Sequence, residues 1–88
     1  MIRREVTVSN RLGLHARAAA KLVQLANLFR SQVTLSTDQM SADAKSILGV
    51  LTLAAGQNTQ LVIEVHGPDE EEAMARIEAL FQQKFGEE

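Results

Sequence analysis

The sequence predicts an α+β protein in which helices cover one face of a single antiparallel sheet. Some segments have an apolar residue at every second position, as half-buried strands do, and others at every third or fourth position, as amphipathic helices do. Their order along the chain is strand, helix, strand, strand, helix, strand, helix. With 88 residues the chain has room for a single domain over residues 1–88, so a site between two lobes is excluded.

The chain is predicted to begin with a strand and an amphipathic helix. Val6 and Val8 alternate with polar neighbours, and the turn-forming residues 9–13 follow them. A helix is predicted from about residue 16 to residue 29. Its apolar positions recur at steps of three and four residues and are Ala19, Leu22, Val23, Ala26 and Phe29.

A hairpin and a short helix are predicted next. Residues 32–37 and 40–44 alternate on either side of a turn, which is typical of a hairpin. The stretch 47–51 fits a strand or a short helix. Ser46 before it is a favoured N-cap and Gly56 after it is a natural terminator, so the helix is preferred.

The last predicted elements are a strand and a closing helix. Residues 61–66 alternate strictly and precede the Gly67-Pro68 break. Asp69 and Glu72 stand three residues apart, as in a capping box, and the helix that they begin is expected to end at Gly86. The core is expected to include Met40 of the hairpin. From the closing helix it is expected to include Ala73, Met74, Ile77, Leu80, Phe81 and Phe85.

The composition excludes several chemistries. Without cysteine the chain has no disulfide, thiol nucleophile, zinc finger or iron–sulfur centre. There is no apolar signal region at the start and no apolar run approaching about 18 residues, so we expect a cytoplasmic protein without membrane insertion. Nine basic and eleven acidic residues give a net charge of -2, and three phenylalanines without tryptophan or tyrosine offer little base stacking, so nucleic-acid binding is not expected.

The charges are unevenly distributed along the chain. Residues 1–30 carry six basic residues and one acidic residue, a net charge of +5, whereas the rest carry three basic and ten acidic residues, a net charge of -7. The first third of the chain therefore suits a small anion or an acidic protein surface. The alternative is that the asymmetry averages out once the chain folds.

The start of the first predicted helix combines three features that favour an anion. The backbone N–H groups of Ala16, Arg17 and Ala18 lack partners within the helix, and the helix dipole favours negative charge there. The Arg17 side chain can add charge-assisted hydrogen bonds. Gly13 gives the loop before His15 conformational freedom. A metal cation would meet the wrong end of the dipole, so we expect no metal site here. We also expect no cofactor.

His15 is the residue in this segment that can carry covalent chemistry. A neutral imidazole is a nucleophile near neutral pH and needs no general base. Phosphorus is the natural electrophile, because a phosphorylated ring would place its oxygens at the helix N–H groups. His66 lies at the end of a strand, and no carboxylate pair is spaced to complete a site. A loop histidine often has no role, but the glycine, the arginine and the helix start favour a phosphoryl acceptor here.

Two short motifs stand out, Gly-Leu-His-Ala-Arg at residues 13–17 and Lys-Ser-Ile-Leu-Gly-Val-Leu at residues 45–51. With both motifs at the expected separation, the whole chain resembles the HPr family, the histidine-containing phosphocarriers of the bacterial phosphoenolpyruvate-dependent phosphotransferase system. The resemblance implies an open-faced β-sandwich with four antiparallel strands under three helices. It also implies that enzyme I phosphorylates His15 on Nδ1, that Arg17 helps to hold the phosphoryl group, and that the group passes to a downstream EIIA-type component.

One position departs from the family pattern. The family usually has proline where this chain has Ala18, and proline suits a first helical turn because it lacks an N–H donor and has its φ fixed. Ala18 restores the donor and loosens the turn slightly, and we expect the chemistry to survive. The resemblance leaves open whether the chain serves the sugar system or is the paralogous carrier of the nitrogen-related branch, NPr.

Ser46 and the apolar residues after it have a structural and a functional interpretation. Ser46 is a plain N-cap in the first. In the second, its surroundings are similar to those phosphorylated by HPr kinase/phosphorylase, and a phosphate there would repel an acidic partner. In the first interpretation the core includes Ile47, Leu48 and Leu51. In the second, these three residues and Ala20 dock partner proteins, as the resemblance implies.

Three functions are weighed from the sequence. The first is a monomeric, stoichiometric phosphoryl carrier that is not an enzyme on its own. The second is a purely regulatory module that binds partners through Ser46 without histidine chemistry. The third is an α+β module that binds a small molecule or RNA, which the scarcity of aromatic residues disfavours.

Overall fold

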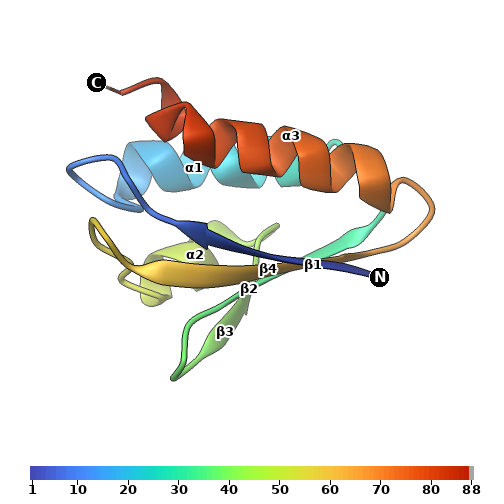
Figure 1. Ribbon diagram of the computed structural model, residues 1–88, viewed down its shortest axis with the longest axis horizontal. Helices are drawn as coiled ribbons and strands as arrows, with labels where there is room; N and C mark the ends of the chain where they lie inside the picture. The colour runs from blue at the N-terminus through green and yellow to red at the C-terminus, as the bar shows by residue number, and fades with distance from the viewer. Residues whose placement is uncertain (88) are drawn as a thin grey trace.

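The computed structural model describes residues 1–87 and contains one sheet, three α-helices and a final 3₁₀ turn. The strands pair antiparallel in the order β1-β4-β2-β3. Helices α1 and α3 lie side by side across one face of the sheet, and α2 packs against α1 and β3 (Figure 1). The predicted fold class is confirmed. The elements are β1 (Ile2–Thr7), α1 (Ala16–Ala26), β2 (Gln32–Ser36), β3 (Ser41–Asp43), α2 (Ile47–Thr52), β4 (Gln60–His66), α3 (Glu70–Gln82) and η1 (Lys84–Gly86).

The register of the sheet follows from the alternation in β4. Its apolar side chains at every second position are buried, while the side chains between them lie on the uncovered face of the sheet. A slip of one residue would move the apolar set to that uncovered face. The apolar pairs that β4 makes with its two neighbours are Ile2 with Val65, Val6 with Leu61, Leu35 with Ile63, and Val33 with Val65.

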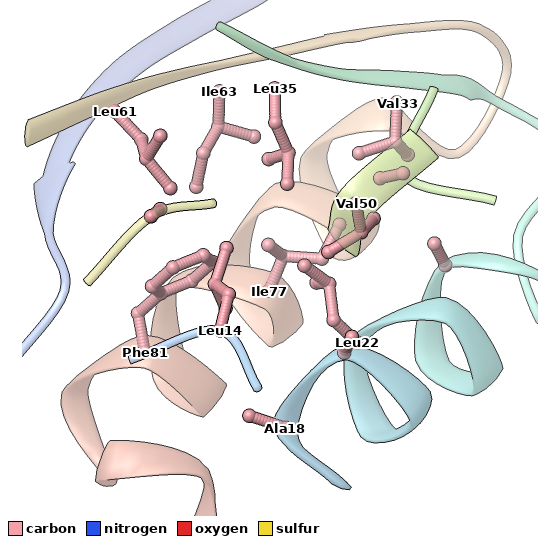
Figure 2. Packing of buried hydrophobic residues seen from close by; sticks show 14 of the residues in the cluster. Leu14, Ala18, Leu22, Val33, Leu35, Val50, Leu61, Ile63, Ile77 and Phe81 are labelled. Carbon is pink, nitrogen blue, oxygen red and sulfur yellow. The ribbon is translucent and has the colours of Figure 1, made fainter. Parts of the chain in front are cut away.

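The core fills the space between the sheet and the helices. Leu22 of α1 and the Ile77 and Phe81 side chains of α3 converge on the buried side chains of β2 and β4 (Figure 2). Each fully buried side chain of this size stabilises the fold by about 1.5–3 kcal/mol on leaving water. Met74 is buried, as predicted, but the prediction for Met40 is wrong, because it lies next to the β2–β3 turn and is 42% exposed.

Helix α1 ends at Ala26 and not at Phe29 as the apolar pattern predicted. Asn27 is the C-cap, and its side-chain Nδ2 donates to the carbonyl of Val23 at 2.8 Å and to that of Lys45 at 3.2 Å. Phe29 is nevertheless buried, because a tight turn follows the helix and carries its ring back to the core. The apolar period therefore continues past the point where the helix ends.

The short helix α2 confirms the predicted N-cap but not the predicted terminator. Ser46 is extended, and its Oγ accepts a hydrogen bond from the Gly49 N–H at 3.1 Å. The helix ends at Thr52, with Leu53 as its C-cap, so Gly56 lies beyond it. Leu53 is buried, and its burial turns the chain inward before the glycine is reached.

The capping box predicted at the start of α3 is absent. The Asp69 carboxylate makes no cap hydrogen bond and instead accepts from the Arg30 N–H at 2.9 Å, the Ser31 N–H at 3.0 Å and the Ser31 Oγ–H at 2.6 Å. The Glu70 side chain accepts from the Gly67 N–H at 3.0 Å. The acidic start of α3 is therefore tied to the end of the α1–β2 connection.

The closing helix also ends earlier than predicted. Helix α3 stops at Gln82, and Lys84 and Phe85 adopt left-handed φ values of 55° and 57°. The chain turns back sharply there and buries the Phe85 ring against Phe81, with ring centroids 4.9 Å apart at 67°. Burial of this aromatic side chain compensates for a backbone conformation that non-glycine residues seldom adopt.

Candidate functional site

His15 is the N-cap of α1. Its backbone is extended, with φ -73° and ψ 178°, and its carbonyl accepts the first helical hydrogen bond from the Ala19 N–H at 2.8 Å. The ring Nδ1 accepts from the Arg17 N–H at 3.4 Å, and the side chain is 25% exposed. The imidazole therefore lies at the amino end of the helix and reaches solvent, as the sequence predicted.

The loop before His15 is fixed by close backbone packing. Gly13 has φ +67°, and a Cβ at this position would lie 2.5 Å from the Ala55 carbonyl oxygen. The Leu14 N–H donates to that same carbonyl at 2.8 Å, and the Leu14 side chain is buried in the core. The chain on the amino side of His15 is therefore held against the segment that follows α2.

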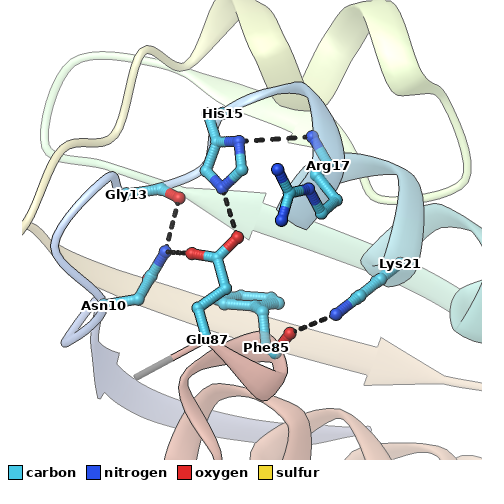
Figure 3. A network of polar contacts seen from close by, with 7 residues as sticks. All are labelled: Asn10, Gly13, His15, Arg17, Lys21, Phe85 and Glu87. Atoms are coloured by element: carbon cyan, nitrogen blue, oxygen red, sulfur yellow. Dashed lines mark hydrogen bonds and ion pairs between the residues drawn. The ribbon is translucent and has the colours of Figure 1, made fainter.

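The other ring nitrogen of His15 contacts a residue that the sequence analysis missed. Glu87 places its Oε2 2.5 Å from His15 Nε2 (Figure 3). Its Oε1 accepts from the Nδ2 of the buried Asn10 at 3.0 Å, and the same Nδ2 donates to the Gly13 carbonyl at 2.8 Å. The hydrogen bonds from Asn10 and His15 hold the pKa of the Glu87 carboxyl below its usual range, and the one from Asn10 has the larger effect.

The turn at Lys84–Phe85 brings Glu87 to the histidine. The buried Phe85 ring anchors this turn, and the Lys21 Nζ of α1 donates to the Phe85 carbonyl at 2.5 Å (Figure 3). We call residues 84–87 the C-terminal hook. No local sequence signal predicts the contact between Glu87 and His15, because these residues are 72 positions apart and are brought together only by tertiary packing.

The backbone N–H of Arg17 faces Nδ1 of His15, and the Arg17 side chain lies beside the ring, towards Glu87 (Figure 3). The Arg17 side chain is exposed and lies on the same side of the site as His15 and Glu87, and its charge contributes to the lowered pKa of Glu87 (Figure 3). The N–H groups of Ala16 and Ala18 have no hydrogen-bond partner among residues 1–87. The helix begins at Ala16 with alanine at position 18, and the Ala18 methyl group is buried (Figure 2).

The α2 patch, which we define as Ile47, Leu48 and Leu51, is exposed, with Leu48 at 74%. These residues are therefore not core residues. Ala20 of α1 is half-buried, and α1 packs against α2. Leu12, in the loop before His15, is also exposed and was not anticipated. Only Val50 of this helix is fully buried, so three of the four large apolar side chains of α2 are exposed.

Two further properties concern metals and membranes. No group of three or more histidine and acidic side chains among the described residues is arranged to hold a metal ion. Within residues 1–87, none of the helices has the length and apolar character needed to cross a bilayer.

Solved structures resemble this fold over its whole length. HPr from Thermoanaerobacter tengcongensis superposes with a TM-score of 0.96 and 40% identity, covering 100% of this chain and 99% of that one. A dimer of HPr from the same organism gives a TM-score of 0.76 and 40% identity, covering 99% of this chain and 100% of that one. The four-stranded sheet with its helices on one face is therefore the architecture of HPr structures.

Sequence comparison agrees with the structural comparison. Residues 2–83 match the family profile described as "PTS HPr component phosphorylation site". The phosphocarrier protein HPr of Cupriavidus necator is 53% identical over 87 residues, covering 99% of this chain and 98% of the relative. The phosphocarrier protein NPr of Proteus mirabilis is 44% identical over 86 residues, covering 97% and 96%. This chain therefore belongs to the HPr family, the phosphocarrier proteins of the phosphotransferase system.

Proposed function

We propose that the chain is a stoichiometric phosphoryl carrier that receives a phosphoryl group from phosphorylated enzyme I on His15 and passes it to an EIIA-type component. The observation that carries this proposal is the partly exposed imidazole at the N-cap of α1, with its Nδ1 facing the first helical turn. The protein supplies the acceptor atom and its surroundings. The partners supply most of the positioning and charge stabilisation that phosphoryl transfer needs.

The transfer step uses the electron pair of Nδ1. Nδ1 attacks phosphorus, the bond between phosphorus and the donor breaks, and its electron pair leaves with the donor. The N–H groups of Ala16 and Ala18, which have no partner among residues 1–87, and the Arg17 N–H that faces Nδ1 are available to the phosphoryl oxygens. The exposed Arg17 guanidinium adds positive charge and charge-assisted hydrogen bonds.

Ser46 is the proposed regulatory site for HPr kinase/phosphorylase. Its Oγ caps α2 and stands immediately before the α2 patch. A phosphoryl group adds a charge of about -1.5 to -2 at pH 7, which the helix start tolerates but an acidic docking partner would not. Regulation then acts by repulsion at the surface and leaves the fold unchanged.

The α2 patch together with Ala20 is the proposed docking surface for the protein partners. Exposed apolar residues on one short helix suit transient association with a complementary surface. We expect the working form to be a cytoplasmic monomer, although an HPr of T. tengcongensis forms a dimer. The sugar-system and nitrogen-branch carriers both remain candidates, because HPr and NPr proteins both match nearly the whole chain.

The test is incubation with enzyme I, magnesium and phosphoenolpyruvate, followed by mass measurement before and after mild acid. We expect one phosphoryl group that acid removes. His15→Ala should acquire none, and the matched variant His66→Ala should behave like the wild type, because His66 is exposed at the far end of β4. An unmodified wild-type protein would contradict the proposal and leave the purely regulatory module as the function to test. In a parallel arm, HPr kinase/phosphorylase and ATP should add an acid-stable group that Ser46→Ala lacks.

A further inference from the structure

The two ring nitrogens of His15 face groups of opposite hydrogen-bonding character. Nδ1 faces a donor, the Arg17 N–H, at 3.4 Å. Nε2 faces a carboxylate oxygen of Glu87 at 2.5 Å. An ionised carboxylate can only accept hydrogen bonds, so the contact at Nε2 requires a hydrogen on that nitrogen. The contact at Nδ1 requires a free electron pair there. Two contacts from different parts of the chain therefore select the same tautomer of the ring.

We propose that Glu87 is a positioning residue for His15, whose carboxylate keeps the ring hydrogen on Nε2 and so leaves the electron pair of Nδ1 available to phosphorus. This inference rests on the proposed function of His15 as a phosphoryl acceptor. Glu87 does not touch the transferred group and acts only through the imidazole. The arrangement follows the general rule that the partner of one ring nitrogen sets the chemistry of the other.

Several contacts hold the Glu87 carboxylate in place for this role. Its second oxygen accepts from the Nδ2 of the buried Asn10, which also donates to the Gly13 carbonyl. The backbone before it is anchored by the buried Phe85 ring and by the hydrogen bond from Lys21 to the Phe85 carbonyl. A side chain fixed at both its carboxylate and its backbone loses little further entropy on holding the ring.

The same contact suits the product of the transfer. When Nδ1 forms its bond to phosphorus and the donor bond breaks, the ring retains the Nε2 hydrogen and gains one positive charge. The negative Glu87 carboxylate then accepts a charge-assisted hydrogen bond from Nε2–H. No proton leaves the ring in this step, so the carboxylate stabilises the developing charge without itself being protonated. The lowered pKa of Glu87 agrees with a carboxylate that stays ionised.

The first test is the tautomer of His15, read from the ¹⁵N chemical shifts of its ring in Glu87→Gln, Glu87→Ala and Glu71→Gln. In Glu87→Gln the amide oxygen is expected to stay on the Asn10 donor, so the NH₂ group faces Nε2 and drives the hydrogen towards Nδ1. Glu87→Ala should move the shifts towards those of a free imidazole. Glu71→Gln is charge-matched and lies at the other end of α3, so it should change nothing. His66 serves as the internal reference, and unchanged His15 shifts in both Glu87 variants would overturn the proposal.

The second test is the initial rate of phosphoryl uptake from enzyme I at limiting concentrations of the chain. We expect both Glu87 variants to take up the group roughly tenfold more slowly than the wild type, with Glu71→Gln unaffected. If the Glu87 variants take up the group as fast as the wild type, the positioning role is overturned. The proposed function would still stand in that case, because the wild type takes up the group. If the wild type takes up no phosphoryl group, the proposed function fails. The ¹⁵N shifts still decide separately whether Glu87 sets the tautomer.

Discussion

At the scale of single residues, Gly13 has little freedom to change. It combines a left-handed φ of +67° with the backbone of Ala55 and Gly56 at 2.5–3.0 Å from the place of a Cβ. Any side chain there must displace the loop that presents His15. Because the obstructing atoms belong to the backbone, they cannot rotate out of the way as a flexible side chain would.

We therefore expect Gly13→Ala to lower the free energy of unfolding by at least about 2 kcal/mol, measured by chemical denaturation. Gly56→Ala is the matched control, because Gly56 has an ordinary φ and a Cβ added there would have no atom within 4 Å. That variant should change the stability by less than about 1 kcal/mol, through the entropy of the unfolded chain. Equal losses in the two variants would show that close packing at Gly13 does not hold the loop.

At the scale of elements, the Asp69 carboxylate joins the start of α3 to the α1–β2 connection. The hydrogen bond from the Ser31 hydroxyl and those from the Arg30 and Ser31 N–H groups hold the pKa of Asp69 below its ordinary value of 3.8. These bonds favour the ionised form. The carboxylate therefore stabilises the fold at pH values above the pKa of the unfolded chain, and this stabilisation is lost as the pH falls through the folded pKa.

The prediction for this contact is a pH-dependent effect of Asp69→Asn. The variant should be less stable than the wild type at neutral pH, and the difference in unfolding free energy should shrink as the pH falls below about 4. Denaturation curves at a series of pH values measure this difference. Asp38→Asn, near the β2–β3 turn, is the control and should differ little from the wild type at any pH. A pH-independent loss in Asp69→Asn would contradict an electrostatic contribution.

At the scale of the whole molecule, the C-terminal hook connects the core to the site. Phe85 is buried against Phe81, and the residue that contacts His15 follows two positions later. We expect Phe85→Ala to lower the unfolding free energy by about 3–5 kcal/mol. It should also reproduce the change in the His15 ¹⁵N shifts that Glu87→Ala causes, because the hook loses its anchor.

Phe29→Ala is the matched control for the hook. Phe29 is also buried but lies after the other end of α1, so its loss should destabilise the protein without changing the ring signals of His15. Stability is measured by denaturation, and the ring signals are measured under conditions where the variants are folded. If Phe85→Ala leaves the His15 shifts unchanged, Glu87 holds its place without the Phe85 anchor.

The parts of this molecule that sequence could predict are those that depend on local patterns. The alternation in β4 and the position of Ser46 before α2 each have a local physical cause, and both predictions are confirmed. The end of α3 could not be predicted, because the left-handed Phe85 is a conformation that only tertiary burial makes favourable. The Glu87 contact depends on that turn, so it was also missed.

The pairing of β1 with β4 determines when the structure can form during synthesis. Thr7 pairs with Gln60 and Ile2 with Val65, so β1 has no neighbour in the sheet until β4 has been made. Such pairing between distant segments gives the fold a high contact order, and the entropy of loop closure is lost before any contact between the strands compensates for it. A nascent chain that stops short of β4 therefore carries His15 without the packed sheet and helices that present it.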